Sequence, residues 1–310
     1  MITATQQRTA QAIVNIFETS SVAGNYGLVT LIAGDTGHLT FGRSQTTLGS
    51  GNLAELLHRY CDNPGARFAA QLQPFLTRFV DKDFSLDSET HLHNILRATA
   101  DDHVMRETQD VFFDQVYWQP AEQSADALGV ATPLGMAVVY DSSVHGSWDR
   151  MRDSTTKAAG KINAIGERAW ITAYVQTRRD WLSKSARSDL RATVYRMDAF
   201  QRLIELSQWG LELPLVVREQ EISVLTLNAT PTGCYDGPQP GSRSLAVQTP
   251  LARGLDVRLV QLGLSAWGAD IKADGVFGRN SADHVRAYQV NHGMPGTGVA
   301  DVALIAQLTA

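Results

Sequence analysis

The stretch IVNIFETSSVAGNYGLVTLIAGDTGHLTFG, residues 13–42, decides the fold because it carries one carboxylate at the end of a helix and another in a glycine-rich turn. Upstream of Glu18, apolar residues recur at helical spacing, at Ala10, Ile13, Val14 and Phe17. The spacing predicts an amphipathic helix whose last turn places Glu18 beside the buried face.

A buried strand is predicted over GLVTLIA, residues 27–33, and the turn GDTGHLTFG, residues 34–42, then holds Asp35. A carboxyl at the apolar end of a helix is expected to keep its proton, whereas one among backbone N–H groups stays ionised. Glycosidic cleavage needs this division, because one carboxyl protonates the leaving oxygen and the other activates water or attacks the sugar. Acidic residues are also common at helix ends and in turns, so the pattern alone leaves a structural role open.

From Glu18 to Tyr60 the chain resembles the catalytic stretch of the family-46 chitosanases, glycoside hydrolases of the lysozyme-like superfamily. The resemblance rests on Glu18, on the GDTGHLT turn with Asp35 and Thr40, and on a following segment with Asn52, Glu55, Leu56 and Tyr60. It implies that Glu18 is the general acid, that Asp35 is the general base of an inverting reaction, and that Thr40 helps to hold the attacking water.

The same resemblance places His38 and Asn52 among the substrate-binding residues. Asn52 matches the position where chitosanases carry an acidic residue that binds the amine of glucosamine, and Gly37 replaces an arginine of the family's turn. An asparagine can hydrogen-bond the neutral amide of an N-acetylated sugar without leaving a buried charge unpaired. Asn52 could equally be the N-cap of a helix that starts at NLAELLH, residues 52–58.

A second set of charged residues lies far along the chain. Asp141 falls in the apolar run LGMAVVYDSSVHG, residues 134–146, where a buried acid needs a cationic partner. Arg178 and Arg196 could supply it. The family resemblance implies that these three residues form a buried charge network behind Glu18, and a purely structural salt bridge is the alternative.

Composition excludes several other classes of protein. The 310 residues carry a formal charge of −5 and no basic cluster interleaved with aromatics, so nucleic acid is not an expected partner. No apolar run reaches 18 residues, so no membrane span is expected. Cys61 and Cys234 are expected to be free thiols. His91 and His93 lie two positions apart on a predicted helix, residues 87–116, and cannot chelate together, so neither a metal nor a cofactor is expected.

The last part of the chain forms a separate unit. A Gly-, Pro- and Ser-rich stretch, residues 230–244, marks a linker over 226–247. Residues 248–310 resemble the three-helix peptidoglycan-binding domain and are expected to fold alone; a generic three-helix bundle is the alternative. The matching residues are Asp256, Val257, Arg258, Gln261, Asp274, Gly275, Phe277, Gly278, Tyr288 and Gln289.

The expected fold is mainly α (α+β): a two-lobed, lysozyme-like helical hydrolase domain with a small β-hairpin over residues 1–225, followed by the linker and the C-terminal module. The expected function is hydrolysis of the β-1,4-linked glycan strands of bacterial peptidoglycan. A chitosanase and a non-catalytic wall-binding protein are the alternatives.

The N-terminus shows no Sec-type signal. An enzyme made in the cytoplasm and acting at the bacterial cell wall is expected, as in phage lysins and injected effectors. The expected partner is peptidoglycan or a related amino-sugar polysaccharide, and the sequence identifies neither an immunity protein nor a secretion machinery.

Overall fold

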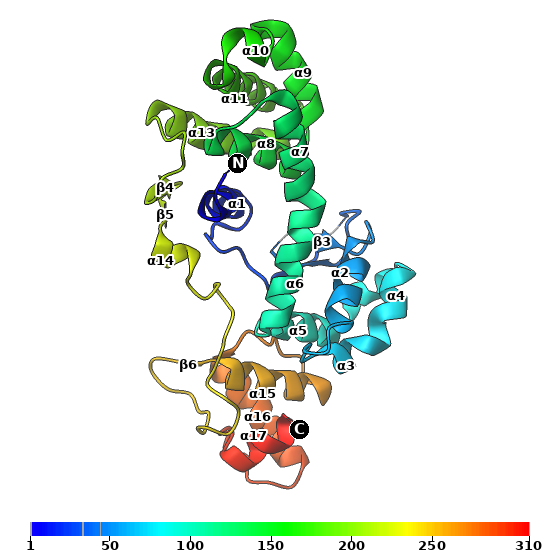
Figure 1. Cartoon of the computed structure of the whole chain (residues 1–310). Helices are drawn as coiled ribbons and strands as arrows, with labels where there is room; N and C mark the ends of the chain where they lie inside the picture. Colours follow the sequence, from blue (N-terminus) through cyan, green and yellow to red (C-terminus); the bar gives the residue numbers. More distant parts are fainter. Residues whose placement is uncertain (1, 33, 44, 310) are drawn as a thin grey trace. The chain divides into compact units, whose positions relative to one another are not determined.

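The computed structural model describes residues 2–32, 34–43 and 45–309 (Figure 1). Most of these residues are helical and the strands are short, so the mainly helical prediction is confirmed. The chain forms two compact units, one made of residues 1–24 and 113–229 and the other of residues 25–112 and 230–310. The predicted hydrolase domain is therefore divided between both units, and the C-terminal module belongs to the second.

The first unit is built around helix α8, Pro133–His145, which is buried from Leu134 to Ser142 and packs on α1, Ala4–Thr19. Thr3 caps α1 through the Gln6 N–H, and Gln6 returns a bond to the Thr3 N–H. The remaining elements are η3 (Asp114–Trp118, a π-helical turn), α7 (Gln119–Leu128), α9 (Trp148–Ala159), α10 (Ile162–Ile165), α11 (Glu167–Ser183), α12 (Ser188–Arg191), α13 (Tyr195–Glu205), α14 (Val224–Leu227) and the antiparallel pair β4 (Leu215–Val217) and β5 (Gln220–Ile222).

The second unit contains a small antiparallel sheet in the order β1-β2-β3, with Val29 opposite Phe41 and Thr40 opposite Thr47. The elements of its first segment, which starts at residue 25, are β1 (Val29–Thr30), β2 (Thr40–Phe41), β3 (Thr46–Thr47), α2 (Asn52–Cys61), α3 (Ala69–Leu72), η1 (Gln73–Phe75), α4 (Leu76–Val80), η2 (Phe84–Ser88), α5 (Thr90–Thr99) and α6 (His103–Phe113). Its C-terminal part consists of β6 (Ala252–Arg253), α15 (Leu255–Ala266), β7 (Val276–Phe277), α16 (Arg279–Asn291) and α17 (Val302–Leu308).

Three local predictions are wrong. The helix expected over residues 87–116 is broken between α5 and α6, where the carboxylate of Asp102 accepts the Val104 N–H and the phenol of Tyr60. The strand expected over 27–33 is regular only at β1; Leu31 and Ile32 are exposed, and Ala33 lies outside the described residues. Asn52 is the first residue of α2 and not its N-cap, which is Gly51 in the left-handed region.

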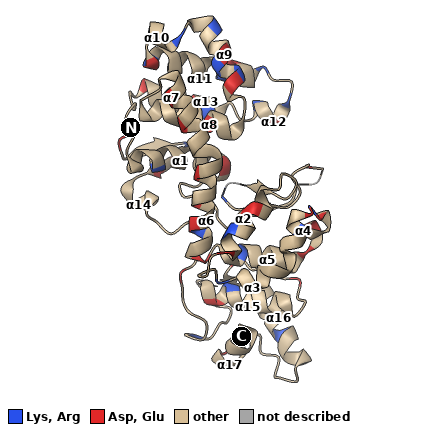
Figure 2. Ribbon diagram, turned by 45° about the vertical axis from the view of Figure 1, so that its right-hand side comes forward, with Lys and Arg blue, Asp and Glu red and all other residues tan. Residues whose placement is uncertain are grey.

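The described part of the chain contains no helix with the length and apolar character needed to cross a bilayer. It also holds no cluster of three or more His, Cys, Asp or Glu side chains suited to a metal ion. Basic and acidic residues are interspersed on most of the helices (Figure 2). Cys61 and Cys234 are free, as predicted.

Candidate active site

Glu18 lies on the last turn of α1, and its side chain is about 30% exposed. Its Oε1 accepts a hydrogen bond from Nη1 of Arg196, on α13, at 2.8 Å. The end of α1 is fixed beside it, because the Tyr195 phenol donates to the carbonyl of Phe17 at 2.8 Å. One oxygen of the Glu18 carboxyl is therefore held by a cation.

Arg196 joins Glu18 to Asp141, which is fully buried on α8. Arg196 Nε donates to Asp141 Oδ1 at 2.9 Å, and Arg178 Nη1 donates to Oδ2 at 2.7 Å. Burial raises the pKa of Asp141, but the two guanidinium groups outweigh it and hold that pKa below its ordinary value. The structure thus brings together Glu18, Asp141, Arg178 and Arg196 in an array of two carboxylates and two guanidinium groups.

His145 extends this array, although its role was not predicted from the sequence. Its Nδ1 lies 2.9 Å from Nη2 of Arg178. Because a guanidinium can only donate, Nδ1 must be the unprotonated acceptor. Burial, followed by the charges of Arg196 and Arg178, lowers the pKa of His145 to about 4. The imidazole is therefore neutral near pH 7.

Tyr117, on η3, is a second residue that sequence reasoning missed. Burial and the negative charge of Glu18 raise the pKa of its phenol. The phenol therefore stays protonated and uncharged within the electrostatic reach of the glutamate. The local sequence VYWQPA, residues 116–121, did not predict this role, because only the folded chain brings η3 to the end of α1.

Asp35 lies in the second unit, in the turn between β1 and β2, where its own N–H donates to the carbonyl of Ile32 at 3.0 Å. The missing side chain of Gly37 makes room for the Asp35 carboxylate, because a Cβ there would lie 3.0 Å from Asp35 Oδ2 and 3.1 Å from a Thr47 methyl. An arginine at this position would displace one of these neighbours. The Gly37 substitution thus permits the present position of the carboxylate.

Thr40, on β2, is buried except for 7% of its surface. Its hydroxyl donates to the carbonyl of His38 at 3.0 Å, so the oxygen lone pairs are the groups left to accept a bond from water. Asn52 begins α2 directly after this hairpin and is partly exposed. The structure therefore places Asp35, Thr40, His38 and Asn52 on one short segment of the second unit.

Asp87 anchors this hairpin, and sequence reasoning missed it. Its Oδ1 accepts the Leu39 N–H and its Oδ2 lies against His38 Nδ1, both at 2.8 Å. The His38 ring, whose residue has a φ of 57°, also stacks on Phe84 with centroids 3.6 Å apart. Asp87 and His38 are 49 positions apart in the chain, so no local pattern could have paired them. His38 is thus held from two sides, and it fixes the turn between Asp35 and Thr40.

Comparison with known proteins identifies two segments. The model of glycosyl hydrolase family 46 matches residues 12–215, and that of a putative peptidoglycan binding domain matches residues 253–308. A chitosanase of Bacillus subtilis strain 168 is 28% identical over 232 residues, which cover 70% of this chain and 83% of the relative.

Two solved structures share the fold over nearly their whole length. A chitosanase of Bacillus subtilis MY002, a glutamate-to-alanine mutant complexed with six GlcN units, is 26% identical with a TM-score of 0.60, covering 70% of this chain and 96% of its own. A family-46 chitosanase of Gynuella sunshinyii, in complex with chitotetraose, is 25% identical with a TM-score of 0.60, covering 73% and 99%. The catalytic and network residues predicted from the sequence all lie within the matched segment.

Proposed function

Because the chain belongs to glycosyl hydrolase family 46, we propose that it cleaves β-1,4 bonds of an amino-sugar polysaccharide with Glu18 as general acid and Asp35 as general base. The observation that carries this assignment is the hold of Arg196 on one oxygen of Glu18, with Asp141 and Arg178 behind it. A partly exposed carboxyl fixed in this way presents its other oxygen in a defined direction.

In the proposed reaction, Glu18 Oε2 gives its proton to the glycosidic oxygen as the C1–O bond breaks. A water attacks C1 from the opposite face, and its proton passes to Asp35. The Thr40 oxygen accepts a hydrogen bond from the other O–H of that water, which stays on C1 as the product hydroxyl, since the Thr40 hydroxyl proton is donated to the carbonyl of His38. Exchange with solvent then returns the proton to Glu18 and removes it from Asp35, and the configuration at C1 is inverted.

Chitosan is the substrate that the relatives support best, because a relative and the solved neighbours are named chitosanases, and two of the neighbours were solved with six GlcN units and with chitotetraose. This ranking reverses the one drawn from the sequence, which put wall glycan first. We therefore propose chitosan, or a partly acetylated form of it, as the first substrate to test.

Peptidoglycan glycan is the second candidate, and specific residues favour it. The module at residues 253–308 matches a peptidoglycan-binding family. By the resemblance, Asn52 stands where chitosanases carry an acid, and the Lys82 ammonium, which donates to the carbonyl of Gly49 at 2.9 Å, lies beside Gly51, the residue before it. A cation near this position disfavours the ammonium groups of chitosan. In this case the enzyme acts at a bacterial cell wall.

The deciding experiment compares kcat/KM of the wild type on highly deacetylated chitosan and on purified sacculi, with mass spectrometry of the new reducing ends. Glu18→Gln should lower kcat on the true substrate about 10²- to 10⁴-fold, since it keeps the bond to Arg196 and loses the proton. Glu122→Gln, which changes another partly exposed glutamate, on α7, is the matched control. Near-wild-type turnover by Glu18→Gln would overturn the assignment of the acid.

Asn52→Asp tests the choice between the two polymers. A carboxylate at this position should shift the ratio of kcat/KM toward chitosan by roughly 10- to 100-fold, because hydrogen bonds to charged groups contribute about 1.5–3 kcal/mol. An unchanged ratio would mean that Asn52 does not contact the sugar that differs between the polymers.

A further inference from the structure

The C-terminal module is docked on the hydrolase part of the second unit, and helix α15 packs directly on α5. The module has an apolar core of its own, built from residues such as Val257, Phe277 and Ile305. The solved chitosanases are covered almost completely by 70–73% of this chain, so the module is an addition to what they contain. The contact between α15 and α5 is therefore specific to this architecture.

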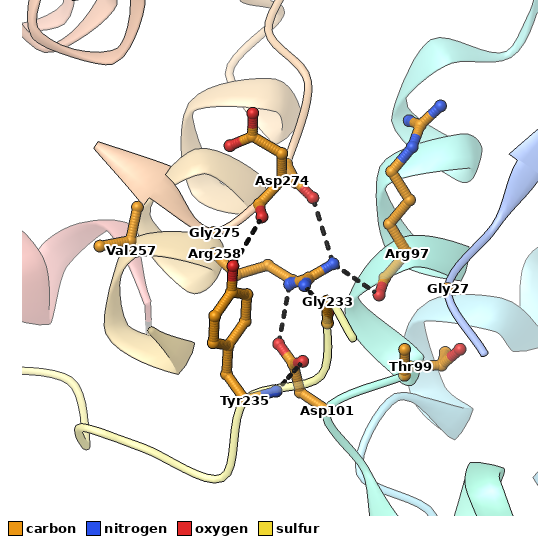
Figure 3. A network of polar contacts seen from close by, with 12 residues as sticks. Gly27, Arg97, Thr99, Asp101, Gly233, Tyr235, Val257, Arg258, Asp274 and Gly275 are labelled. Carbon is orange, nitrogen blue, oxygen red and sulfur yellow. Dashed lines mark hydrogen bonds and ion pairs between the residues drawn. The ribbon is translucent and has the colours of Figure 1, made fainter. Parts of the chain in front are cut away.

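The centre of the contact is Arg258, a residue of the module that is only 4% exposed (Figure 3). Its Nε lies 2.8 Å from Oδ2 of Asp101, whose side chain is completely buried at the end of α5. The N–H is not aligned with that oxygen, so the contact is an ion pair and not a hydrogen bond. The guanidinium also donates to the carbonyls of Arg97 (2.9 Å) and Gly233.

Asn94, also on α5, makes a second polar contact with the module. Its Nδ2 donates to the carbonyl of Ile271 at 2.7 Å and to the Ser265 hydroxyl at 2.9 Å. Its Oδ1 accepts the Ala273 N–H at 2.9 Å. Both the oxygen and the nitrogen of this buried amide are hydrogen-bonded, so these bonds can form with the module backbone in one position only.

The segment that connects the two parts, predicted as a linker from its composition, is also held in place. The Tyr235 N–H donates to Asp101 Oδ1 at 2.8 Å, and its ring packs under the Arg258 guanidinium (Figure 3). Cys234 is buried against Tyr26 and Ala100. The chain therefore enters the module through ordered contacts and not as a free tether.

These contacts specify an orientation more than they add stability. A buried ion pair contributes little net free energy, because desolvation offsets the attraction. Burial indeed raises the pKa of Asp101 to about 6, against the lowering effects of Arg258 and of the Tyr235 N–H. Several directional bonds around two buried charges nevertheless exclude other arrangements, since any rotation of the module would leave those charges without partners.

The same end of α5 supports the catalytic hairpin. A Cβ on Gly27, two positions before β1, would lie 3.0 Å from the Ala100 Cβ and 3.2 Å from the Arg97 carbonyl oxygen. That carbonyl is the one that Arg258 binds. The Arg258–Asp101 contact and the start of the hairpin that carries Asp35 therefore share one rigid turn at the end of α5.

We propose that the Arg258–Asp101 joint makes the polymer-binding module a fixed extension of the lobe that carries Asp35, so that polymer bound by the module is presented to the catalytic hairpin in one orientation. The proposal rests on the proposed function, since it assumes a polymeric substrate. Arg258 is in this view a positioning residue. A tethered module would raise only the local concentration of the enzyme.

Rigidity is tested without substrate, by distances between spin labels on Thr77→Cys and Ala287→Cys in the full chain with Cys61→Ser. Both label sites are exposed, on α4 and on α16. Cys234 is retained, because burial raises the pKa of its thiol to about 11 and keeps it unreactive. One narrow distance distribution is expected for the wild type. A broad distribution would overturn the proposal, whichever polymer the enzyme cleaves.

The double variant Asp101→Asn/Arg258→Met removes both buried charges together, so that neither is left unpaired if the chain folds. It should broaden the distribution and lower kcat/KM on the insoluble polymer about 10-fold, with kcat on a short soluble oligomer changed less than about 2-fold. Arg243→Met/Asp256→Asn is the matched control, because it removes a comparable ion pair, at 2.7 Å, between the connecting segment and α15. Equal losses in both variants, or a loss equally large on the oligomer, would overturn the orienting role. If the wild type cleaves chitosan and not sacculi, the variants are compared on insoluble chitosan. That result excludes peptidoglycan as the substrate, and the comparison on chitosan then tests the orienting role of the module.

Discussion

At Asp141, one buried carboxylate balances two arginines, and one of these also holds Glu18. Removal of the carboxylate takes an ion-pair partner from each of the buried guanidinium groups of Arg178 and Arg196. We expect Asp141→Ala to lower the free energy of unfolding by about 3–5 kcal/mol, as is common when one partner of a buried charge set is removed. Urea unfolding measures the change, and Asp126→Ala, at an exposed position on α7, is the control. A midpoint equal to that of the wild type would contradict the structural role of the array.

His145 gives this array a pH dependence. Its folded pKa of about 4 lies below the ordinary value of 6.5, so the folded state binds fewer protons than the unfolded state between these values. Stability should therefore rise from pH 4 to pH 6.5 and be lost as the pH falls through that window. The groups that face the imidazole are Arg178, Arg196, Asp141 and Asp189.

The variant His145→Gln keeps an acceptor for Arg178 and cannot titrate. Its free energy of unfolding should change less than that of the wild type across this window. His103→Gln, whose side chain is 70% exposed in the wild type, is the control and should follow the wild-type curve. Parallel curves for the wild type and His145→Gln would show that His145 is not the titrating group.

At the scale of single elements, the hairpin that carries Asp35 is too short to position a catalytic residue through its own ladder. Its strands pair over two residues each, and Asp87 supplies the missing support through His38 and the Leu39 N–H. We expect Asp87→Ala to lower kcat about 10-fold, because a loosened turn misplaces the base by a fraction of an ångström or more. Asp81→Ala, at an exposed position at the end of α4, should leave kcat unchanged. An unchanged kcat for Asp87→Ala, in a chain with the wild-type melting temperature, would show that the turn holds itself.

Elements governed by local patterns were predictable from the sequence. The apolar run at 134–146 becomes α8, Pro133–His145, because the run and Thr132 as N-cap decide it locally. The predicted helix over 87–116 failed because Asp101 and Asp102 form bonds to Tyr235 and Tyr60, far away in the chain. The strand predicted over 27–33 was too long, because β2, the partner of β1, has only two residues. Tertiary partners decided both cases.

At the scale of the whole molecule, the order of motifs allowed the family to be predicted, and residues 12–215 confirm it. The identities of Glu18, Asp35 and Thr40 came from that resemblance. The residues that support them, such as Asp87 and His145, were not predicted, because each contacts residues far away in the chain. The joint between module and lobe was also invisible, since Asn94 and Ile271 lie 177 positions apart.

We expect the module to retain the whole molecule on polymer. In the Glu18→Gln background, which prevents digestion, we expect the full chain to sediment with purified sacculi. A chain that ends at residue 229 should stay in the supernatant, at least about 10-fold less bound, because it lacks the second contact with the polymer.

The truncated chain has a precedent for folding, since the solved chitosanases are almost completely covered by 70–73% of this chain. Loss of the module exposes Asp101 and Asn94 to water, where both side chains are hydrated. The truncated chain therefore keeps no unpaired buried charge at this surface of α5. Circular dichroism verifies the fold of the truncated chain, and sedimentation at about 0.5 M salt removes weak electrostatic attachment. Equal sedimentation of the two chains would place the wall contact in the hydrolase lobes and remove the module's anchoring role, while a narrow spin-label distribution would still establish its rigid docking.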